Sequence, residues 1–239
     1  MLSPGKWPPP QASSTRGEGA FRRLAQQRRS MGIIYITRHG ETEWNVAGRI
    51  QGHTDVSLSE RGREQAGMLA RRLASIPIDA VYSSDLSRAA ETARVAVGER
   101  DVPVTFTEEL REYNKGVFEG LTEAEYRDKY PELYEPSMAN DLDFAPPGGE
   151  TIRDTSARLA GIIQRVKDAH MDESALIVGH GGSLRAGIVS LLGLPLEANW
   201  KFAMSNCSLT VIYTYTDNSV MHLYNDTSHI SGVVRAWER

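Results

Sequence analysis

The chain of 239 residues contains one cysteine, Cys207, and no apolar run near the roughly 18 residues that a membrane-spanning helix needs. A single cysteine excludes an internal disulfide framework and a cysteine-based structural zinc site. A basic excess is missing too, because 27 Lys and Arg stand against 31 Asp and Glu for a net charge of −4, which provides no electrostatic surface for nucleic acid. With 40% hydrophobic residues, the chain can still bury a substantial core. These features predict a globular protein of a reducing cytoplasm, without a membrane or nucleic-acid partner.

The first 30 residues differ in composition from the rest. They hold six basic residues and one acidic residue, whereas residues 31–239 hold 21 basic and 30 acidic residues. They are rich in Pro, Gly, Ser, Gln and Arg, show no apolar periodicity, and lack the apolar core of a secretory signal. We therefore expect residues 1–30 to be a disordered basic extension and residues 31–239 to form the folded domain. A targeting arm, or a translation start at Met31, would account for the extension.

From Met31 onward, short apolar runs alternate with amphipathic segments. The predicted strands are 32–37, 79–83, 102–107, 175–178, 209–215 and 220–224. The predicted helices are 59–74, 86–97 with Ser84 or Asp85 as its cap, 122–130, 151–169 and 183–192. This alternation predicts an α/β fold of three layers, an α/β/α sandwich whose mostly parallel sheet carries helices on both faces.

Charged and imidazole side chains follow four of these strands. Arg38 and His39 follow the first, Arg88 the second, Glu112 the third, and His180 the fourth. Ligands of such sheets bind at the carboxyl ends of the strands, so these residues are expected to meet at one rim. Each alone is more typical of a solvated loop or surface charge. Together they suit a phosphate, because guanidinium groups bind its oxygens in pairs and a neutral imidazole is a nucleophile near neutral pH.

Several motifs occur in a fixed order along residues 31–239. They are RHGET with Asn45 downstream, Gln51-Gly52, SSDLSRAAETA, LREYNKGVFEG, PPGGET, HGGSLR and Asn206-Cys207-Ser208. In this order the motifs resemble those of the histidine phosphatase superfamily, in the branch that includes cofactor-dependent phosphoglycerate mutases and related phosphatases. The chain departs from that pattern at Lys115, where the family often has an aromatic residue. A lysine there would favour acidic substrates if it faced the site, or would simply be solvated.

The resemblance implies a role for each motif residue. His39 would be the nucleophile that forms a phosphohistidine, and Glu112 would protonate the leaving oxygen and then activate water. The phosphoryl oxygens would be held by Arg38, Arg88 and His180, with Asn45 and the backbone of Gly181 completing the cradle. The predicted catalytic residues are His39, Glu112, His180, Arg38 and Arg88. The predicted substrate-binding residues are Arg38, His39, Gly40, Glu41, Thr42, Asn45, Gln51, Gly52, Arg88, Glu112, His180 and Gly181.

No metal site or cofactor is expected. The six histidines form no HExxH pattern, the chain has no Gly-rich nucleotide-binding motif, and two arginines at the predicted site would repel a divalent cation. The expected partner is a small phosphorylated substrate, and the sequence is compatible with a homodimer.

Three functions are open from the sequence: a phosphomonoesterase, a phosphoglycerate mutase, and an inactive binding module of the same fold. No expected catalytic position is substituted, which disfavours the binding module. Mutases of the family usually carry Asn where this chain has Gly182, and a more basic insertion where residues 121–150 hold two basic and eight acidic residues. The sequence therefore favours a phosphatase over a mutase.

Overall fold

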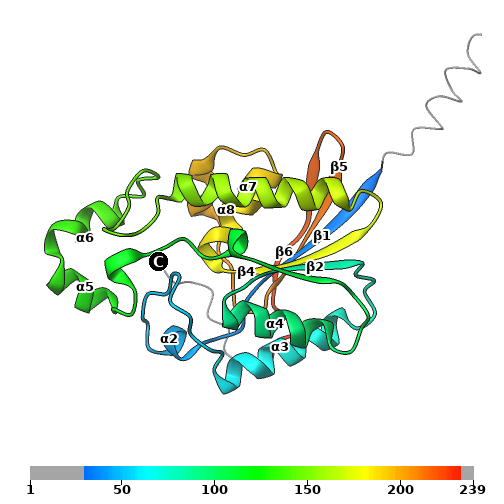
Figure 1. Ribbon diagram of the computed structural model, residues 1–239, viewed down its shortest axis with the longest axis horizontal. Helices are drawn as coiled ribbons and strands as arrows, with labels where there is room; N and C mark the ends of the chain where they lie inside the picture. Colours follow the sequence, from blue (N-terminus) through cyan, green and yellow to red (C-terminus); the bar gives the residue numbers. More distant parts are fainter. Residues whose placement is uncertain (1–29, 233–239) are drawn as a thin grey trace, which may run out of the picture. The chain divides into compact units, whose positions relative to one another are not determined.

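The computed structural model describes residues 30–232, and a single six-stranded sheet lies at the centre of this part of the chain (Figure 1). Its strands are β1 Met31–Arg38, β2 Ala80–Ser84, β3 Val104–Thr107, β4 Ser174–Gly179, β5 Leu209–Tyr215 and β6 Ser219–Asp226. They are ordered β3-β2-β4-β1-β5-β6. The first four of this order pair in parallel, whereas β5 and β6 pair antiparallel to their neighbours. The predicted, mostly parallel sheet is confirmed.

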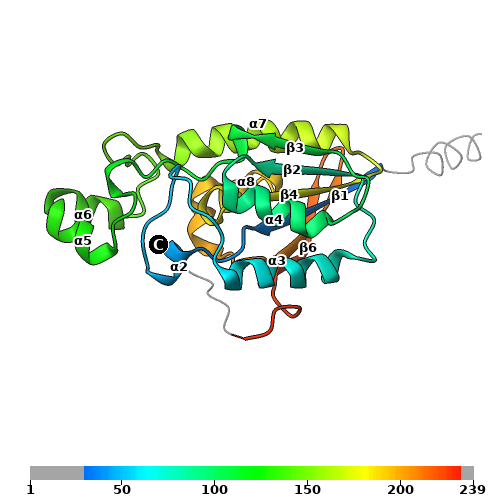
Figure 2. The ribbon, with the colours of Figure 1, turned by 60° about the horizontal axis from the view of Figure 1, so that its bottom comes forward.

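Helices cover both faces of the sheet (Figures 1 and 2). The α-helices are α2 Glu43–Val46, α3 Glu60–Leu73, α4 Ser87–Val97, α5 Glu123–Lys129, α6 Pro131–Met138, α7 Ile152–Ala169 and α8 Gly181–Leu191, and the 3₁₀ turns are η1 Glu108–Leu110, η2 Gly116–Phe118 and η3 Leu196–Lys201. Side chains alternate across β4, where Ala175 and Ile177 pack with α7 and α8, and Leu176 and Val178 with α3 and α4. The two resulting cores confirm the three-layer sandwich.

Local sequence explains most helix starts. Ser59, Thr122 and Thr151 occupy the N-caps of α3, α5 and α7, and each side chain accepts a hydrogen bond from a backbone N–H three residues ahead. The α4 cap was predicted at Ser84 or Asp85, and this is wrong. Its N-cap is Leu86, which has no capping side chain.

A distant carboxylate replaces the local cap of α4. Asp55 Oδ1 accepts a hydrogen bond of 2.7 Å from the N–H of Ser87, the first residue of the helix. Asp85 is engaged elsewhere, because it accepts a hydrogen bond of 2.8 Å from Nε of Arg111. Tertiary contacts of this kind leave no trace in the helix's own sequence.

The helices α2 and α6 were not predicted. Both are short, with four residues in α2 and eight in α6. The interior of α6 also contains Pro136, and a proline at such a position disfavours a helix. Together with α5, α6 lies beyond the carboxyl ends of the parallel strands (Figure 1). The described residues contain no helix long and apolar enough to cross a membrane. The predicted extension falls almost wholly on residues 1–29, outside the described residues, and stays a prediction.

Candidate active site

Neighbouring strands bring the two histidines together. β1 and β4 pair in parallel with Arg38 opposite Gly179, so the residues that follow, His39 and His180, leave the sheet side by side. The N–H of His39 donates to the carbonyl of Gly179 at 2.9 Å. As a result, the centroids of the two buried imidazole rings lie 5.1 Å apart.

A backbone carbonyl sets the tautomer of His39. Its Nδ1 lies 2.7 Å from the carbonyl oxygen of Gly40, which can only accept, so Nδ1 carries the proton and Nε2 keeps its lone pair. Burial, and then the positive charges of Arg88 and Arg38, hold the pKa of His39 well below the ordinary value of 6.5. The ring is therefore neutral at physiological pH, with Nε2 free to act as a nucleophile.

Arg88 orients His180 in the opposite sense. Nε of Arg88 donates to Nδ1 of His180 at 3.2 Å, which places the proton of the neutral ring on Nε2. Burial, and then the positive charge of Arg88, lower the pKa of His180 well below 6.5. Nε2 of His180 is buried and has no hydrogen-bond partner among the described residues. A buried donor of this kind fits a ligand oxygen placed beside His39.

Arg88 is the largest fully buried side chain of the described residues. Two carbonyls hold its guanidinium, that of Thr54 at 2.9 Å and that of Gly52 at 2.8 Å. Burial lowers the pKa of Arg88 to about 10, so the group stays charged at neutral pH. A side chain on Gly52 would clash, since its Cβ would lie 2.0 Å from Oε1 of Glu119. Because position 52 is a glycine, the loop that contains it can lie close enough for its carbonyl to bind Arg88.

The carboxylate of Glu112 caps the start of α8. Its oxygens accept hydrogen bonds from the N–H groups of Gly182 at 2.8 Å, Ser183 at 2.7 Å and Tyr113 at 3.0 Å. In this state Glu112 is an acceptor only. It must take up a proton before it can donate one to a leaving group.

The predicted substrate-binding residues fall into two groups. Some line a cavity, and the others support the residues that line it. A cavity of about 800 Å³ opens above the strand ends. The predicted residues that line it are Arg38, His39, Gln51, Arg88, Glu112, His180 and Gly181. Nε2 of Gln51 is buried without a hydrogen-bond partner among the described residues. Gly40, Glu41, Thr42, Asn45 and Gly52 are not among the described lining residues.

The supporting residues hold the loop after β1. Asn45 and Thr42 form a capping box at α2, in which Oδ1 of Asn45 accepts from the backbone N–H and the hydroxyl of Thr42. The N–H of Gly40 donates to the hydroxyl of Thr92 at 3.0 Å, and the N–H of Glu41 donates to the side chain of Gln65 at 2.9 Å. These contacts position Arg38 and His39 from behind.

Several lining residues were not predicted. They include Tyr113, Arg185, Trp200, Met204, Phe118, Tyr126, Met138 and Phe144, of which Tyr126 belongs to α5 and Met138 to α6. Arg185 is the arginine of the HGGSLR motif, so the motif contained a signal for it. Lys115 also lines the cavity, and its Nζ donates to the hydroxyl of Tyr113 at 2.6 Å.

The cavity is chemically suited to a phosphoryl group. Two buried guanidinium groups, Arg38 and Arg88, supply positive charge, His180 supplies a neutral donor, and His39 supplies a nucleophilic nitrogen. Within residues 30–232, no group of three or more His, Cys, Asp or Glu side chains is arranged to hold a metal ion.

Comparison with known proteins gives consistent results. The family model of the histidine phosphatase superfamily (branch 1) matches residues 34–227. The chain is 32% identical to phosphoserine phosphatase 1 of Hydrogenobacter thermophilus over 82% of this chain and 93% of that protein. It is 36% identical to the metal-independent phosphoserine phosphatase of Arabidopsis thaliana over 84% of each chain. Among solved structures, the alpha-ribazole phosphatase of Shigella flexneri matches with a TM-score of 0.78 and 30% identity over 84% of this chain and 98% of that chain.

Proposed function

Because the chain belongs to the histidine phosphatase superfamily and is a phosphatase, we propose that it hydrolyses small phosphomonoesters by way of a phosphohistidine at His39. The observation that carries this proposal is the hydrogen bond from Nδ1 of His39 to the carbonyl of Gly40, which leaves the lone pair on Nε2. The low pKa of the buried ring keeps that lone pair available at neutral pH.

In the first step, Nε2 of His39 attacks phosphorus, an N–P bond forms, and the bond from phosphorus to the ester oxygen breaks. Arg38, Arg88 and Nε2–H of His180 stabilise the charge on the phosphoryl oxygens. The carboxyl group of Glu112, in its acid form, gives its proton to the departing oxygen, so the product leaves as an alcohol.

In the second step, the carboxylate of Glu112 takes a proton from water as the water oxygen attacks phosphorus. The N–P bond breaks, inorganic phosphate forms, and Glu112 regains the proton that it lost. Guanidinium and imidazole groups supply the charge that a metal provides in other phosphatases, and we propose that the reaction is metal-independent.

We propose a small phosphorylated acid, such as phosphoserine, as the substrate class. Two relatives at 32% and 36% identity are named phosphoserine phosphatases, and one of them is named metal-independent. The geometry at Gly182 also disfavours a mutase. A Cβ there would lie 2.2 Å from Cε1 of Tyr113 and 2.7 Å from Oε1 of Glu112, so the asparagine usual in mutases does not fit this arrangement.

A brief incubation with radiolabelled phosphoserine, quenched before steady state, tests the proposal. Acid-labile, base-stable label is expected on the protein, and His39→Gln should lose both the label and phosphate release. His222→Gln, which removes an exposed histidine on β6, is the control and should keep both. Full activity in His39→Gln would contradict the role of His39, and interconversion of 2- and 3-phosphoglycerate without phosphate release would indicate a mutase.

A cytoplasmic location, a homodimer, and the division into an extension of residues 1–30 and a domain of residues 31–239 stay predictions of the sequence.

A further inference from the structure

A second buried guanidinium site lies along the wall of the cavity that α8 forms. Arg185 is 6% exposed and lines the cavity. It follows Gly181 by four residues on α8, so the two share one helix face a single turn apart. The proposed mechanism does not use Arg185.

Arg185 and Arg38, which lines the phosphoryl site, bind the same short backbone segment. Nη1 of Arg38 donates to the carbonyl of Met204 at 3.0 Å, and Nη1 of Arg185 donates to the carbonyl of Phe202 at 3.4 Å. The two carbonyls stand two residues apart in the segment that follows η3, so one short stretch of backbone holds both guanidinium groups.

Trp200 adds a donor to the same wall. Its indole Nε1–H is buried, has no hydrogen-bond partner among the described residues, and belongs to a side chain that lines the cavity. An indole N–H only donates, and burying it without an acceptor is unfavourable, so the group suits a ligand atom that accepts. Trp200 lies two residues before Phe202, whose carbonyl accepts the hydrogen bond from Arg185.

A carboxylate matches these two donors better than a second phosphate does. It is an acceptor with one charge, and its two oxygens suit a guanidinium fork. Glu123, Asp141 and Glu150 also line the cavity and would repel a dianion more strongly than a single charge. We propose that Arg185 and Nε1–H of Trp200 bind the carboxylate of the substrate and so select phosphorylated amino or hydroxy acids. This inference rests on the proposed phosphatase function.

Two substrates that differ only in the carboxylate test it. The measurement is kcat/KM for phosphoserine and for phosphoethanolamine, with the full-length protein. We expect the native protein to prefer phosphoserine, and Arg185→Gln to reduce the ratio of the two kcat/KM values about tenfold to a hundredfold, the range expected for one charge-assisted hydrogen bond. The loss should appear mainly in KM for phosphoserine. Trp200→Phe keeps the ring, removes the donor, and should reduce the ratio severalfold.

Lys201→Gln is the matched control, because it removes one positive charge from an exposed residue beside Trp200. Its ratio should stay within twofold of the native value. An unchanged ratio in Arg185→Gln, equal use of both substrates by the native protein, or a preference for alpha-ribazole phosphate would overturn the carboxylate site while leaving the phosphatase intact. If Arg185→Gln does not fold, an unchanged ratio in Trp200→Phe overturns it alone. Failure of the phosphatase itself would appear differently, as no phosphate release from any of these substrates.

Discussion

At the scale of single residues, the site depends on two neutral histidines with opposite tautomers. The carbonyl of Gly40 places the proton of His39 on Nδ1, and Arg88 leaves the proton of His180 on Nε2. One ring thus offers a lone pair and the other a donor. Protonation of His39 would remove the nucleophile, so its low pKa has a direct kinetic consequence.

The acid limb of the pH profile should lie well below pH 6.5. Because kcat/KM reports the free enzyme and the pKa of His39 in the ligand-free protein is well below 6.5, the rate should not fall through a histidine titration as pH decreases from 7.5 to 6.5. The profile should be corrected for the second ionisation of the substrate, near pH 6 for alkyl phosphates. His53→Gln is the control for a second histidine beside the site, because Nε2 of His53 lies 2.8 Å from the carbonyl of Glu112. A limb near pH 6.5 that persists in this variant would contradict the neutral nucleophile.

Glu112→Gln should discriminate between leaving groups. General-acid assistance is worth roughly 10²–10⁴ in rate for a poor leaving group, and far less for a nitrophenolate, which can leave unprotonated. We expect a large loss of phosphoryl transfer from phosphoserine and a small one from p-nitrophenyl phosphate. Water activation is lost as well, so p-nitrophenyl phosphate should give a burst of nitrophenol followed by a slow steady state.

Glu109→Gln is the control for that experiment, because this carboxylate lies near Glu112 in sequence and accepts a hydrogen bond of 2.5 Å from Arg165 at the surface. Equal slowing of both substrates by Glu112→Gln without a burst, or the burst appearing in Glu109→Gln, would assign the acid to another residue.

The residues within the ordered motifs could be predicted, whereas their through-space partners could not. His39, His180 and Arg88 each stand in a motif at the end of a strand or the start of a helix, and the structure brings them together. Trp200 stands in no motif quoted for the family. Its place in the cavity depends on how η3 packs against α8, which periodicity in a single sequence does not reveal.

At the scale of elements, the segment that carries Glu112 is held by one side chain of α7. Arg158 donates through Nη1 to the carbonyls of Glu109 and Arg111, each at 3.0 Å, and through Nη2 to that of Glu112 at 3.3 Å. It also binds Oε2 of Glu150 at 2.9 Å. Arg158 therefore acts as a positioning residue for Glu112.

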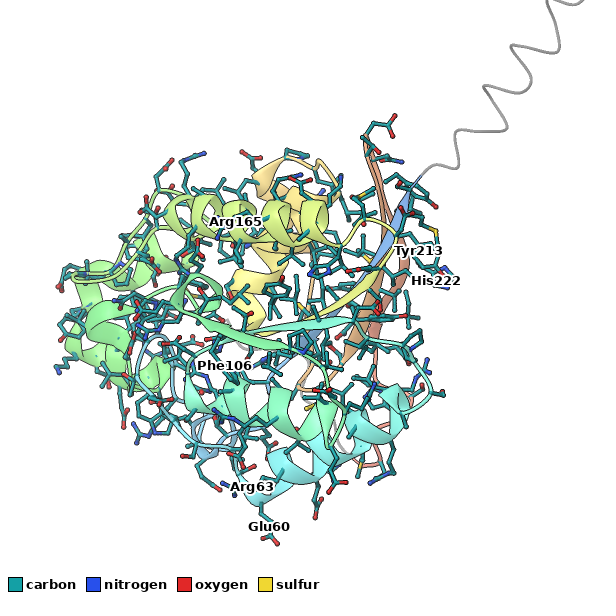
Figure 3. All side chains as sticks on the ribbon, turned by 45° about the vertical axis from the view of Figure 1, so that its right-hand side comes forward. Glu60, Arg63, Phe106, Arg165, Tyr213 and His222 are labelled. Carbon is teal, nitrogen blue, oxygen red and sulfur yellow. The ribbon has the colours of Figure 1, made fainter. Side chains whose placement is uncertain are left out.

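Arg158→Gln should reproduce part of the leaving-group effect of Glu112→Gln. Releasing the carbonyls loosens Glu112, so kcat for phosphoserine should fall about tenfold or more while kcat for p-nitrophenyl phosphate changes little. Arg165→Gln is the matched control on the same helix, because the Arg165 side chain lies on the surface and binds the side chain of Glu109 (Figure 3). An equal loss for both substrates in Arg158→Gln would show a purely structural role.

Elements were predictable in proportion to their length and periodicity. The 18-residue α7 has a regular apolar stripe and a Thr151 cap, and its predicted range, 151–169, differs by one residue at its start. The four-residue α2 and the Pro-containing α6 lack such a stripe. Short elements of this kind are stabilised by tertiary contacts rather than by local propensity.

At the scale of the whole molecule, the buried site makes folding depend on pH. The unfolded chain binds a proton at His39 and at His180 as pH falls through about 6.5, whereas in the folded protein burial holds both pKa values well below that. The unfolded state therefore binds more protons, and the free energy of unfolding decreases as pH falls. The stabilising contribution is present above pH 6.5 and is lost below it.

Denaturant unfolding at pH 7.5 and 5.5 measures this dependence. Each histidine should contribute on the order of 1 kcal/mol to the difference between the two free energies of unfolding. His39→Gln and His180→Gln should each reduce that difference by a similar amount, because the variant has one proton fewer to bind when unfolded. His222→Gln, which removes an exposed ring stacked on Tyr213 at the edge of the sheet, is the control for losing a histidine in general (Figure 3). If all three variants kept the native pH dependence, both rings would be protonated in the folded protein, and the neutral nucleophile and neutral donor would have to be abandoned together.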